Sequence, residues 1–126
     1  MAKRVISNKI STESLPKQAS LYADVWDVVR QIPKGKVTSY GAIATYLGPK
    51  MSARMVGWAM GNSKNASPAI PAQRVVNRNG ELTAKHQFES DTTMQDLLQK
   101  DGVHVQNDKI IDFKNHFWDP SIELSL

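Results

Sequence analysis

The chain has 126 residues and a net charge of +4, with 40% hydrophobic and 22% charged residues, a balance typical of one soluble globular domain. It contains no cysteine, which excludes disulfides, thiolate nucleophiles and cysteine-based zinc sites. No apolar run approaches the roughly 20 residues of a membrane-spanning helix, and the basic N-terminus lacks the apolar segment of a secretory signal. We therefore expect a cytoplasmic protein with no membrane partner.

The basic residues are unevenly placed along the chain. Between Val28 and Gly80 there are eight of the 16 lysines and arginines and none of the 12 acidic residues. A surface built from this stretch would attract a polyanion such as DNA, because cations that neutralise phosphates release counterions. On charge alone, a solvated basic face without a partner is an equal alternative. The eight residues are Arg30, Lys34, Lys36, Lys50, Arg54, Lys64, Arg74 and Arg78.

The chain begins with a polar segment followed by a helical pattern. Residues 1–18 show no helical period, which predicts a loosely docked tail before a single domain at 19–126. From 19 to 32 the apolar residues recur at helical spacing, and Ser20 is the predicted cap of this helix. Trp26 is expected to pack in the core.

Two short helices are predicted next, at 39–48 with Thr38 or Ser39 as cap and at 52–61, joined by a Gly-Pro turn. Small residues and a short turn allow two crossing helices to pack closely, and Gly57 is expected to permit such a contact. This pair indicates a helix-turn-helix, although the pattern has many false positives. Ile43, Ala44 and Leu47 are expected to face inward, and Ala53, Val56 and Met60 are expected to share one face of the next helix.

The second half of the chain is predicted to form small hairpins and one helix. Residues 74–77 and 81–83 flank an Asn-Gly dipeptide, which favours a tight β-turn, so we expect these segments to pair. Asp91 is the predicted cap of a helix closed by Gly102, and a second hairpin is expected within 103–111. The predicted fold class is mainly α with small β-hairpins.

Four motifs in this order carry a family resemblance: I-P-x-G-x-V-x-S-Y-x-x-I-A, A-R-x-V-G-x-A-M, P-x-x-R-V-V and G-V-x-V. From about Tyr22 to Trp118 the chain resembles the C-terminal domain of O6-alkylguanine-DNA alkyltransferases. The family signature P-C-H-R-V here reads P-A-Q-R-V, from Pro71 to Val75. The chain is therefore more similar to the alkyltransferase-like proteins, which lack the acceptor cysteine and usually carry Trp there. The resemblance implies a winged-helix-like, helix-turn-helix DNA-binding domain of the alkyltransferase C-terminal type.

The P-A-Q-R-V segment lacks the groups that alkyl transfer needs. Dealkylation requires a thiolate, and the methyl side chain of Ala72 cannot replace it. In the family a neighbouring His helps to ionise the thiol, whereas Gln73 has no titratable proton and cannot act as that base. The three histidines share no helical or zinc-like spacing. We expect a protein that is not an enzyme and uses no cofactor or metal.

The resemblance implies DNA binding through the second helix of the pair. Family proteins place this helix, here 52–61, in the minor groove, and an Arg at its start, here Arg54, fills the gap left by a flipped base. Ala53 and Gly57 are small enough for close approach, and Tyr40 matches a family Tyr that crowds the 3′ phosphate and promotes flipping. The predicted DNA-binding residues are Lys36, Ser39, Tyr40, Ala53, Arg54 and Gly57.

The resemblance also implies a pocket for the alkylated base. Ala72 would sit at its floor, Lys85 would lie against the base, and residues 79–83 would form the covering loop, with Arg74 in a structural role. The small side chain of Ala72 leaves open whether larger O6 groups are accommodated or methyl groups are held poorly. The predicted pocket residues are Trp58, Pro71, Ala72, Gln73, Arg74, Gly80 and Lys85.

The predicted function is non-enzymatic recognition of O6-alkylguanine in double-stranded DNA by a monomer that flips the base and marks it for nucleotide excision repair proteins. One alternative is a helix-turn-helix regulator without lesion specificity, which would need several polar base-reading side chains on the second helix. Another is a hydrolase or glycosylase, which would need a placed carboxylate or metal. Repair recruitment rests on the resemblance alone.

Overall fold

The computed structural model describes residues 17–124. The predicted tail lies outside this range except for its last two positions, which belong to the first helix. The structure is mainly helical with two very small sheets, as predicted. In chain order the elements are α2 Lys17–Gln31, β1 Thr38–Ser39, α3 Tyr40–Leu47, α4 Ala53–Gly61, η2 Ser63–Asn65, η3 Ala72–Arg74, β2 Val75–Val76, η4 Lys85–Gln87, α5 Thr93–Lys100, β3 Val105–Gln106, β4 Lys109–Ile110, α6 Phe113–His116 and α7 Pro120–Glu123.

The predicted helix pair is confirmed by its capping. Ser39 accepts a hydrogen bond from the Ala42 amide at the start of α3, and Ser52 accepts one from the Met55 amide at the start of α4. Such side-chain oxygens satisfy amides that have no partner within the helix. Gly48 ends α3 with a positive φ of 114° and begins the turn into α4.

Helices α2, α3 and α4 enclose the first of two hydrophobic clusters. Trp26 packs against this cluster and its indole Nε1 donates to the Ala59 carbonyl at 2.9 Å, which confirms its predicted core position. One detail of α4 was predicted wrongly: a Cβ on Gly57 would meet nothing within 4 Å, so this glycine makes no close helix contact. Ala53, at the start of α4, is exposed, whereas Val56 and Met60 are buried. The buried members of the cluster are Val25, Val28, Val29, Ile32, Ile43, Ala44, Val56, Ala59, Met60, Val75 and Trp118.

The predicted pairing of 74–77 with 81–83 is wrong apart from one backbone hydrogen bond, which the Asn77 amide donates to the Glu81 carbonyl at 3.2 Å. The turn itself forms, since the Gly80 amide donates to the Asn77 carbonyl, but β2 pairs in parallel with β1. Val75 and Val76 are at most 1% exposed, and pairing with the buried strand β1 satisfies their backbone groups in the interior. Residue 81 instead bridges to Lys109 of β4.

The second hydrophobic cluster lies under α5 and the β3–β4 hairpin. This hairpin is antiparallel and lies where it was predicted. The helix α5 begins at Thr93 and not next to Asp91, because the side chains of Ser90 and Thr93 hydrogen-bond each other in the preceding turn. The cap of α2 was also misplaced, since that helix begins before Ser20. The buried members of this cluster are Val37, Val76, Leu82, Ala84, Met94, Leu98, Val103, Val105 and Ile110.

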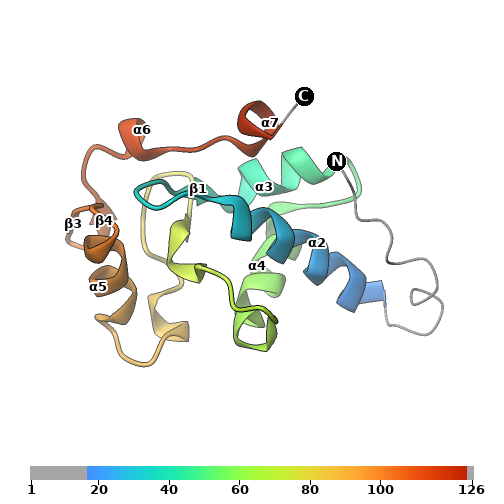
Figure 1. Cartoon of the computed structure of the whole chain (residues 1–126), viewed down its shortest axis with the longest axis horizontal. Helices are drawn as coiled ribbons and strands as arrows, with labels where there is room; N and C mark the ends of the chain where they lie inside the picture. The colour runs from blue at the N-terminus through green and yellow to red at the C-terminus, as the bar shows by residue number, and fades with distance from the viewer. Residues whose placement is uncertain (1–16, 125–126) are drawn as a thin grey trace.

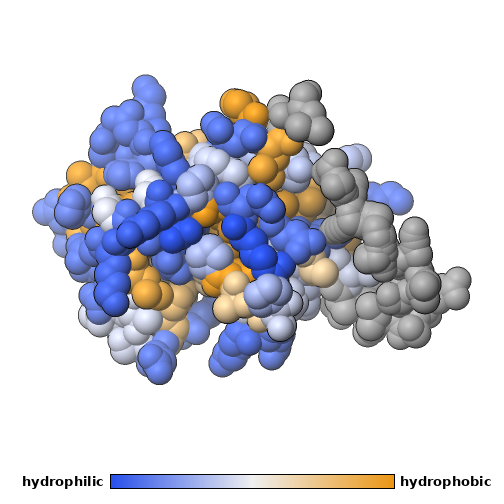
Figure 2. Space-filling model, in the orientation of Figure 1, coloured by the Kyte–Doolittle hydropathy of each residue, from blue (hydrophilic) through white to orange (hydrophobic). Residues whose placement is uncertain are grey.

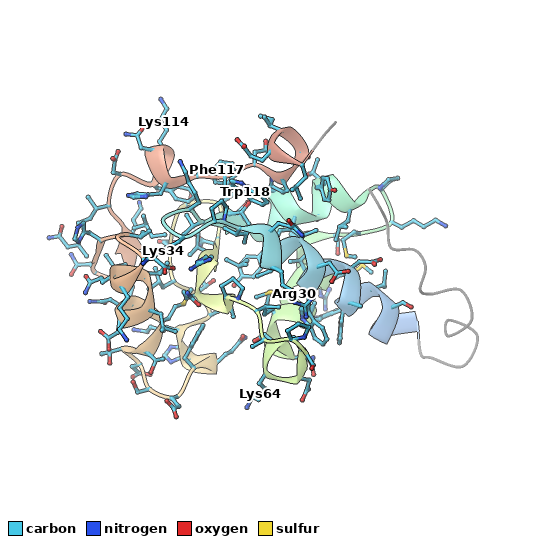
Figure 3. All side chains as sticks on the ribbon, viewed as in Figure 1. Arg30, Lys34, Lys64, Lys114, Phe117 and Trp118 are labelled. Atoms are coloured by element: carbon cyan, nitrogen blue, oxygen red, sulfur yellow. The ribbon has the colours of Figure 1, made fainter. Side chains whose placement is uncertain are left out.

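Figure 1 shows the two halves side by side, with α2, α3 and α4 at one end and α5 with β3 and β4 at the other. The C-terminal segment returns across both, and Phe117 and Trp118 lie against the turn after α2 (Figure 3). The face in Figure 2 is mostly hydrophilic, with apolar residues visible in small areas. None of the helices within 17–124 has the length and apolar character required to cross a membrane.

Candidate DNA interface and base pocket

The exposed face of α4 carries a stacked arginine and tryptophan. The Arg54 guanidinium carbon lies 5.4 Å from the centre of the Trp58 ring, and Trp58 is 46% exposed. Within residues 17–124 no acidic side chain forms an ion pair with Arg54. A surface salt bridge therefore does not account for this arginine, and its charge faces solvent beside an aromatic ring.

The backbone around Arg54 is unusually open. Ala53 is exposed, and a Cβ added at Gly41 or Gly57 would meet nothing within 4 Å. A shallow depression lies between α3 and the start of α4, so another molecule can approach this backbone closely. Its lining residues are Gly41, Ala44, Thr45, Gly48, Pro49, Met51, Ser52 and Ala53.

The other predicted DNA contacts differ in accessibility. Tyr40 is the first residue of α3 and is half-buried, packed against the first cluster. Lys36 is also half-buried, and its Nζ donates to the Asn115 carbonyl at 3.2 Å. Ser39 is only 6% exposed and its hydroxyl caps α3, so it is better assigned to holding the helix start than to a DNA contact.

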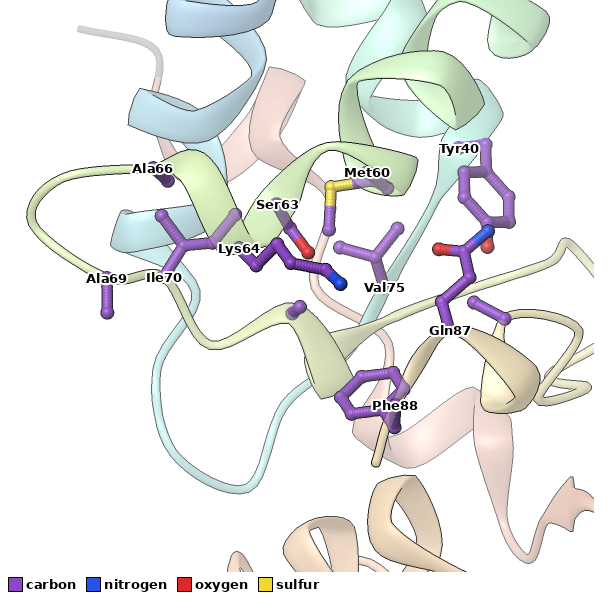
Figure 4. A pocket seen from close by; sticks show the side chains of 12 residues that line it. Tyr40, Met60, Ser63, Lys64, Ala66, Ala69, Ile70, Val75, Gln87 and Phe88 are labelled. Atoms are coloured by element: carbon purple, nitrogen blue, oxygen red, sulfur yellow. The ribbon is translucent and has the colours of Figure 1, made fainter. Parts of the chain in front are cut away.

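A cavity of about 240 Å³ lies where the two hydrophobic clusters meet (Figure 4). Tyr40 and Ala72 line it, so the structure brings together the residue predicted to promote flipping and the predicted pocket floor. Sequence reasoning did not predict the other lining residues: Met60 and Val75 lie within the motifs but were not assigned to the pocket, and the rest come from segments with no recognisable motif. Within the described part of the chain the lining residues are Tyr40, Met60, Ser63, Lys64, Ala66, Ala69, Ile70, Ala72, Val75, Ala84, Gln87 and Phe88.

Directly after Ala72 the chain is held by Asp101. The Arg74 guanidinium donates to both Asp101 oxygens at 2.8 and 3.0 Å and to the Ile32 carbonyl at 2.9 Å. Gln73 is 8% exposed, and its Nε2 donates to the same carboxylate at 3.2 Å. The hydrogen bond from Arg74 holds the pKa of Asp101 below its ordinary value, against the opposing effect of burial.

Asp101 was not identified from the sequence as a site residue. Its place before the G-V-x-V motif was the only signal, and the motif does not reveal its partners. The predicted structural role of Arg74 agrees with these contacts. Gln73 and Arg74 are both absent from the cavity lining, because their side chains are directed to Asp101.

The remaining predicted pocket residues also lie outside the lining. The Lys85 Nζ is 2.7 Å from an Asp108 oxygen, and this hydrogen bond raises the pKa of the lysine. Gly80 has φ +79°, and a Cβ there would lie 2.9 Å from the Phe113 ring, so only glycine fits this turn. Pro71 and Trp58 are likewise not part of the lining.

The predicted basic stretch divides into paired and unpaired cations. Arg30 donates to Asp27 at 2.7 Å and to the Pro68 carbonyl at 2.6 Å, and Arg74 is paired with Asp101. The acids that pair these two arginines lie on either side of the acid-free stretch in sequence. Of the His, Asp and Glu side chains in the part of the chain that the structure describes, no three gather as a metal site.

Residues 20–103 match the family described as 6-O-methylguanine DNA methyltransferase, DNA binding domain. The chain is 33% identical over 105 residues to Alkyltransferase-like protein 1 of Schizosaccharomyces pombe, which covers 79% of this chain and 94% of that protein. It is 34% identical over 107 residues to a DNA base-flipping protein of Escherichia coli, and the alignment covers 84% of this chain and 80% of that protein. It resembles the crystal structure of S. pombe Atl1 in complex with damaged DNA containing O6-carboxymethylguanine, with a TM-score of 0.68 and 31% identity over 81% of this chain and 97% of that chain.

Proposed function

The chain belongs to the family of the 6-O-methylguanine DNA methyltransferase DNA-binding domain, and from this we propose that it binds O6-alkylguanine in duplex DNA without altering the base. A single observation carries this proposal. Arg54, which is exposed and forms no ion pair with an acidic side chain within residues 17–124, lies at the start of α4, and the end of the same helix contributes Met60 to the cavity. One helix thus links a DNA-facing cation to a space for a base.

The proposed binding mode assigns a role to each feature. Helix α4 enters the minor groove, where the small residues Ala53 and Gly57 let the backbone approach the duplex. Arg54 leaves its stack on Trp58 and fills the gap in the base stack, while Tyr40 favours extrusion of the altered nucleotide into the cavity. Flipping costs a few kcal/mol and costs less for a weakly paired base, so the lesion itself contributes selectivity.

The lining of the cavity supports the proposal that the chain does not transfer an alkyl group. Ala72 presents a methyl group where an acceptor thiolate would have to be, and the neighbouring Gln73 is bonded to Asp101. Neither side chain can attack an alkyl carbon or remove a proton. The flipped base therefore leaves the cavity unchanged, and repair requires another protein. We place that step with nucleotide excision repair proteins in the cytoplasm, with this chain acting as a monomer.

The test compares matched duplexes that contain O6-methylguanine or guanine, with binding measured by fluorescence anisotropy across a salt series. We expect tighter binding to the lesion and a fall in both affinities with salt, because phosphate contacts release counterions. Mass analysis of the recovered DNA should show an intact methyl group. Equal affinity for the two duplexes at every salt concentration would contradict lesion recognition. Preference for one undamaged sequence would favour a helix-turn-helix regulator instead.

A second experiment tests why the chain is inactive. The single change Ala72→Cys introduces a thiol with an ordinary pKa of about 8.5, so only a few per cent is thiolate at neutral pH. Adding Gln73→His introduces an imidazole at a position whose present side-chain Nε2 donates to Asp101 at 3.2 Å, so we expect the carboxylate to orient the new base. We expect the double variant to accept a methyl group faster than either single variant, as measured by protein mass. Equal rates of methyl transfer for Ala72→Cys and the double variant would show that the base is not needed.

A further inference from the structure

Among the described residues that line the cavity, Lys64 is the one with a charged side chain. It lies in η2, directly after α4, and Figure 4 shows its ammonium group directed into the cavity. Within residues 17–124 it forms no ion pair with an acidic side chain. The cavity wall therefore holds a cation whose charge no acidic side chain within residues 17–124 neutralises.

The rest of the lining cannot balance this charge. Its polar members are neutral, namely Tyr40, Ser63 and Gln87, and the others are apolar. A neutral alkyl group in the cavity would gain nothing from the ammonium group, whereas a carboxylate would form a charge-assisted hydrogen bond with it. The small side chain of Ala72 leaves space on the same lining for a group larger than methyl.

We propose that Lys64 makes the cavity selective for O6-alkyl groups that carry a carboxylate over neutral groups of the same size. This inference rests on the proposed function, because it requires that the altered guanine enters the cavity. Lys64 is itself exposed, so water and salt screen the interaction and the expected preference is modest, about three- to tenfold. Because Lys64 is exposed, it could instead contact a DNA phosphate at the cavity mouth. The experiment must distinguish this contact from a contact with the carboxylate of the adduct.

The experiment uses three duplexes of one sequence that carry O6-carboxymethylguanine, O6-carbamoylmethylguanine or guanine. The two adducts have nearly the same shape and differ in charge. We expect the wild-type protein to bind the carboxymethyl duplex about three- to tenfold more tightly than the carbamoylmethyl duplex at low salt. In Lys64→Gln this ratio should fall to about one, while both adducts are still preferred over guanine.

The matched control is Lys114→Gln, which removes an exposed lysine at the opposite edge of the molecule (Figure 3). It should keep the wild-type ratio, and thermal unfolding should confirm that both variants are folded. A ratio that Lys64→Gln leaves unchanged would overturn the proposal, as would an equal loss of affinity for all three duplexes, which indicates a phosphate contact. If the wild-type protein does not distinguish either adduct from guanine, the proposed function itself fails.

Discussion

Arg54 and Arg74 lie in the same acid-free stretch, yet they occupy opposite environments. Arg54 is exposed on α4 and contacts only the face of Trp58 among the interactions described. The Arg74 side chain is 17% exposed and makes three hydrogen bonds, two of them to Asp101. The first arginine is available to a ligand, and the second is already part of the scaffold.

The difference shows that the number of basic residues in a stretch does not give the charge available for binding. Asp101 neutralises Arg74 from 27 residues further along the chain, beyond the acid-free stretch. A paired guanidinium would have to break two charge-assisted hydrogen bonds to reach a phosphate, whereas Arg54 would give up only an exposed ring contact. Arg74 fixes the segment that follows Ala72, and the exposed Arg54 remains available for the proposed contact with DNA.

The largest expected effect is the loss of stability in Arg74→Ala. This change leaves the Asp101 carboxylate, whose side chain is 9% exposed, without its main partner. Breaking such a pair from one side costs about 3 kcal/mol in the free energy of unfolding. Urea denaturation measures this change, and Arg78→Ala, which removes an exposed arginine, is the control and should have little effect. An equal loss in both variants would contradict the scaffold role.

The second effect concerns Arg54→Ala, which should change binding and leave stability nearly unaltered. Without the side chain that fills the base stack, preference for O6-methylguanine over guanine should fall roughly tenfold, equivalent to about 1.4 kcal/mol. Affinity for undamaged DNA should fall less, because one cation is lost from a larger set of phosphate contacts. Anisotropy titrations of both duplexes measure the two effects. An Arg54→Ala variant with full lesion preference would show that another group fills the stack.

The helices and strands differ in the same way in how well they can be predicted from sequence. The helices α3 and α4 depend on adjacent residues, the caps Ser39 and Ser52 and the turn at Gly48, so local patterns were sufficient. The pairing of β2 with β1 depends on burial of Val75 and Val76, which no local signal encodes, and the Asn-Gly turn favoured the wrong partner.

The candidate site divides in the same way. Motif positions suggested Tyr40, Arg54 and Ala72 as candidate site residues, because the resemblance supplies their places in order along the chain. Lys64 lies outside those motifs and Asp101 lies at the edge of one, and their places in the candidate site depend on how distant segments pack. Only the folded chain brings Asp101 to Arg74 and directs Lys64 into the cavity.

The third expected effect is a pH dependence that originates at Asp101. Its pKa is lowered in the folded protein, so its contribution to stability is present above the unfolded value of about 3.9 and is lost as pH falls through the lower folded value. Asp101→Asn should be less stable than the wild type at neutral pH and should lose less stability on acidification. Urea denaturation between neutral and acidic pH measures how the free energy of unfolding of each protein changes with pH. An equal change in the two proteins would assign the acid sensitivity to other carboxyl groups.

The smallest expected effect tests whether Trp58 assists Arg54. An exposed cation–π contact contributes about 0.5–1 kcal/mol, so loss of the ring in Trp58→Leu should reduce lesion preference by about two- to fivefold if the ring holds the arginine in place for insertion. The measurement is a double-mutant cycle on the ratio of lesion to guanine affinity.

Coupling between the two residues decides the outcome of this cycle. If the ring acts only through the guanidinium, Trp58→Leu should have no further effect in an Arg54→Ala background, because the group that it positions is already gone. Additive losses would mean that Trp58 contacts DNA on its own. A higher lesion preference in Trp58→Leu alone would mean that the stack restrains Arg54, since the arginine must then break the ring contact before it can enter the duplex.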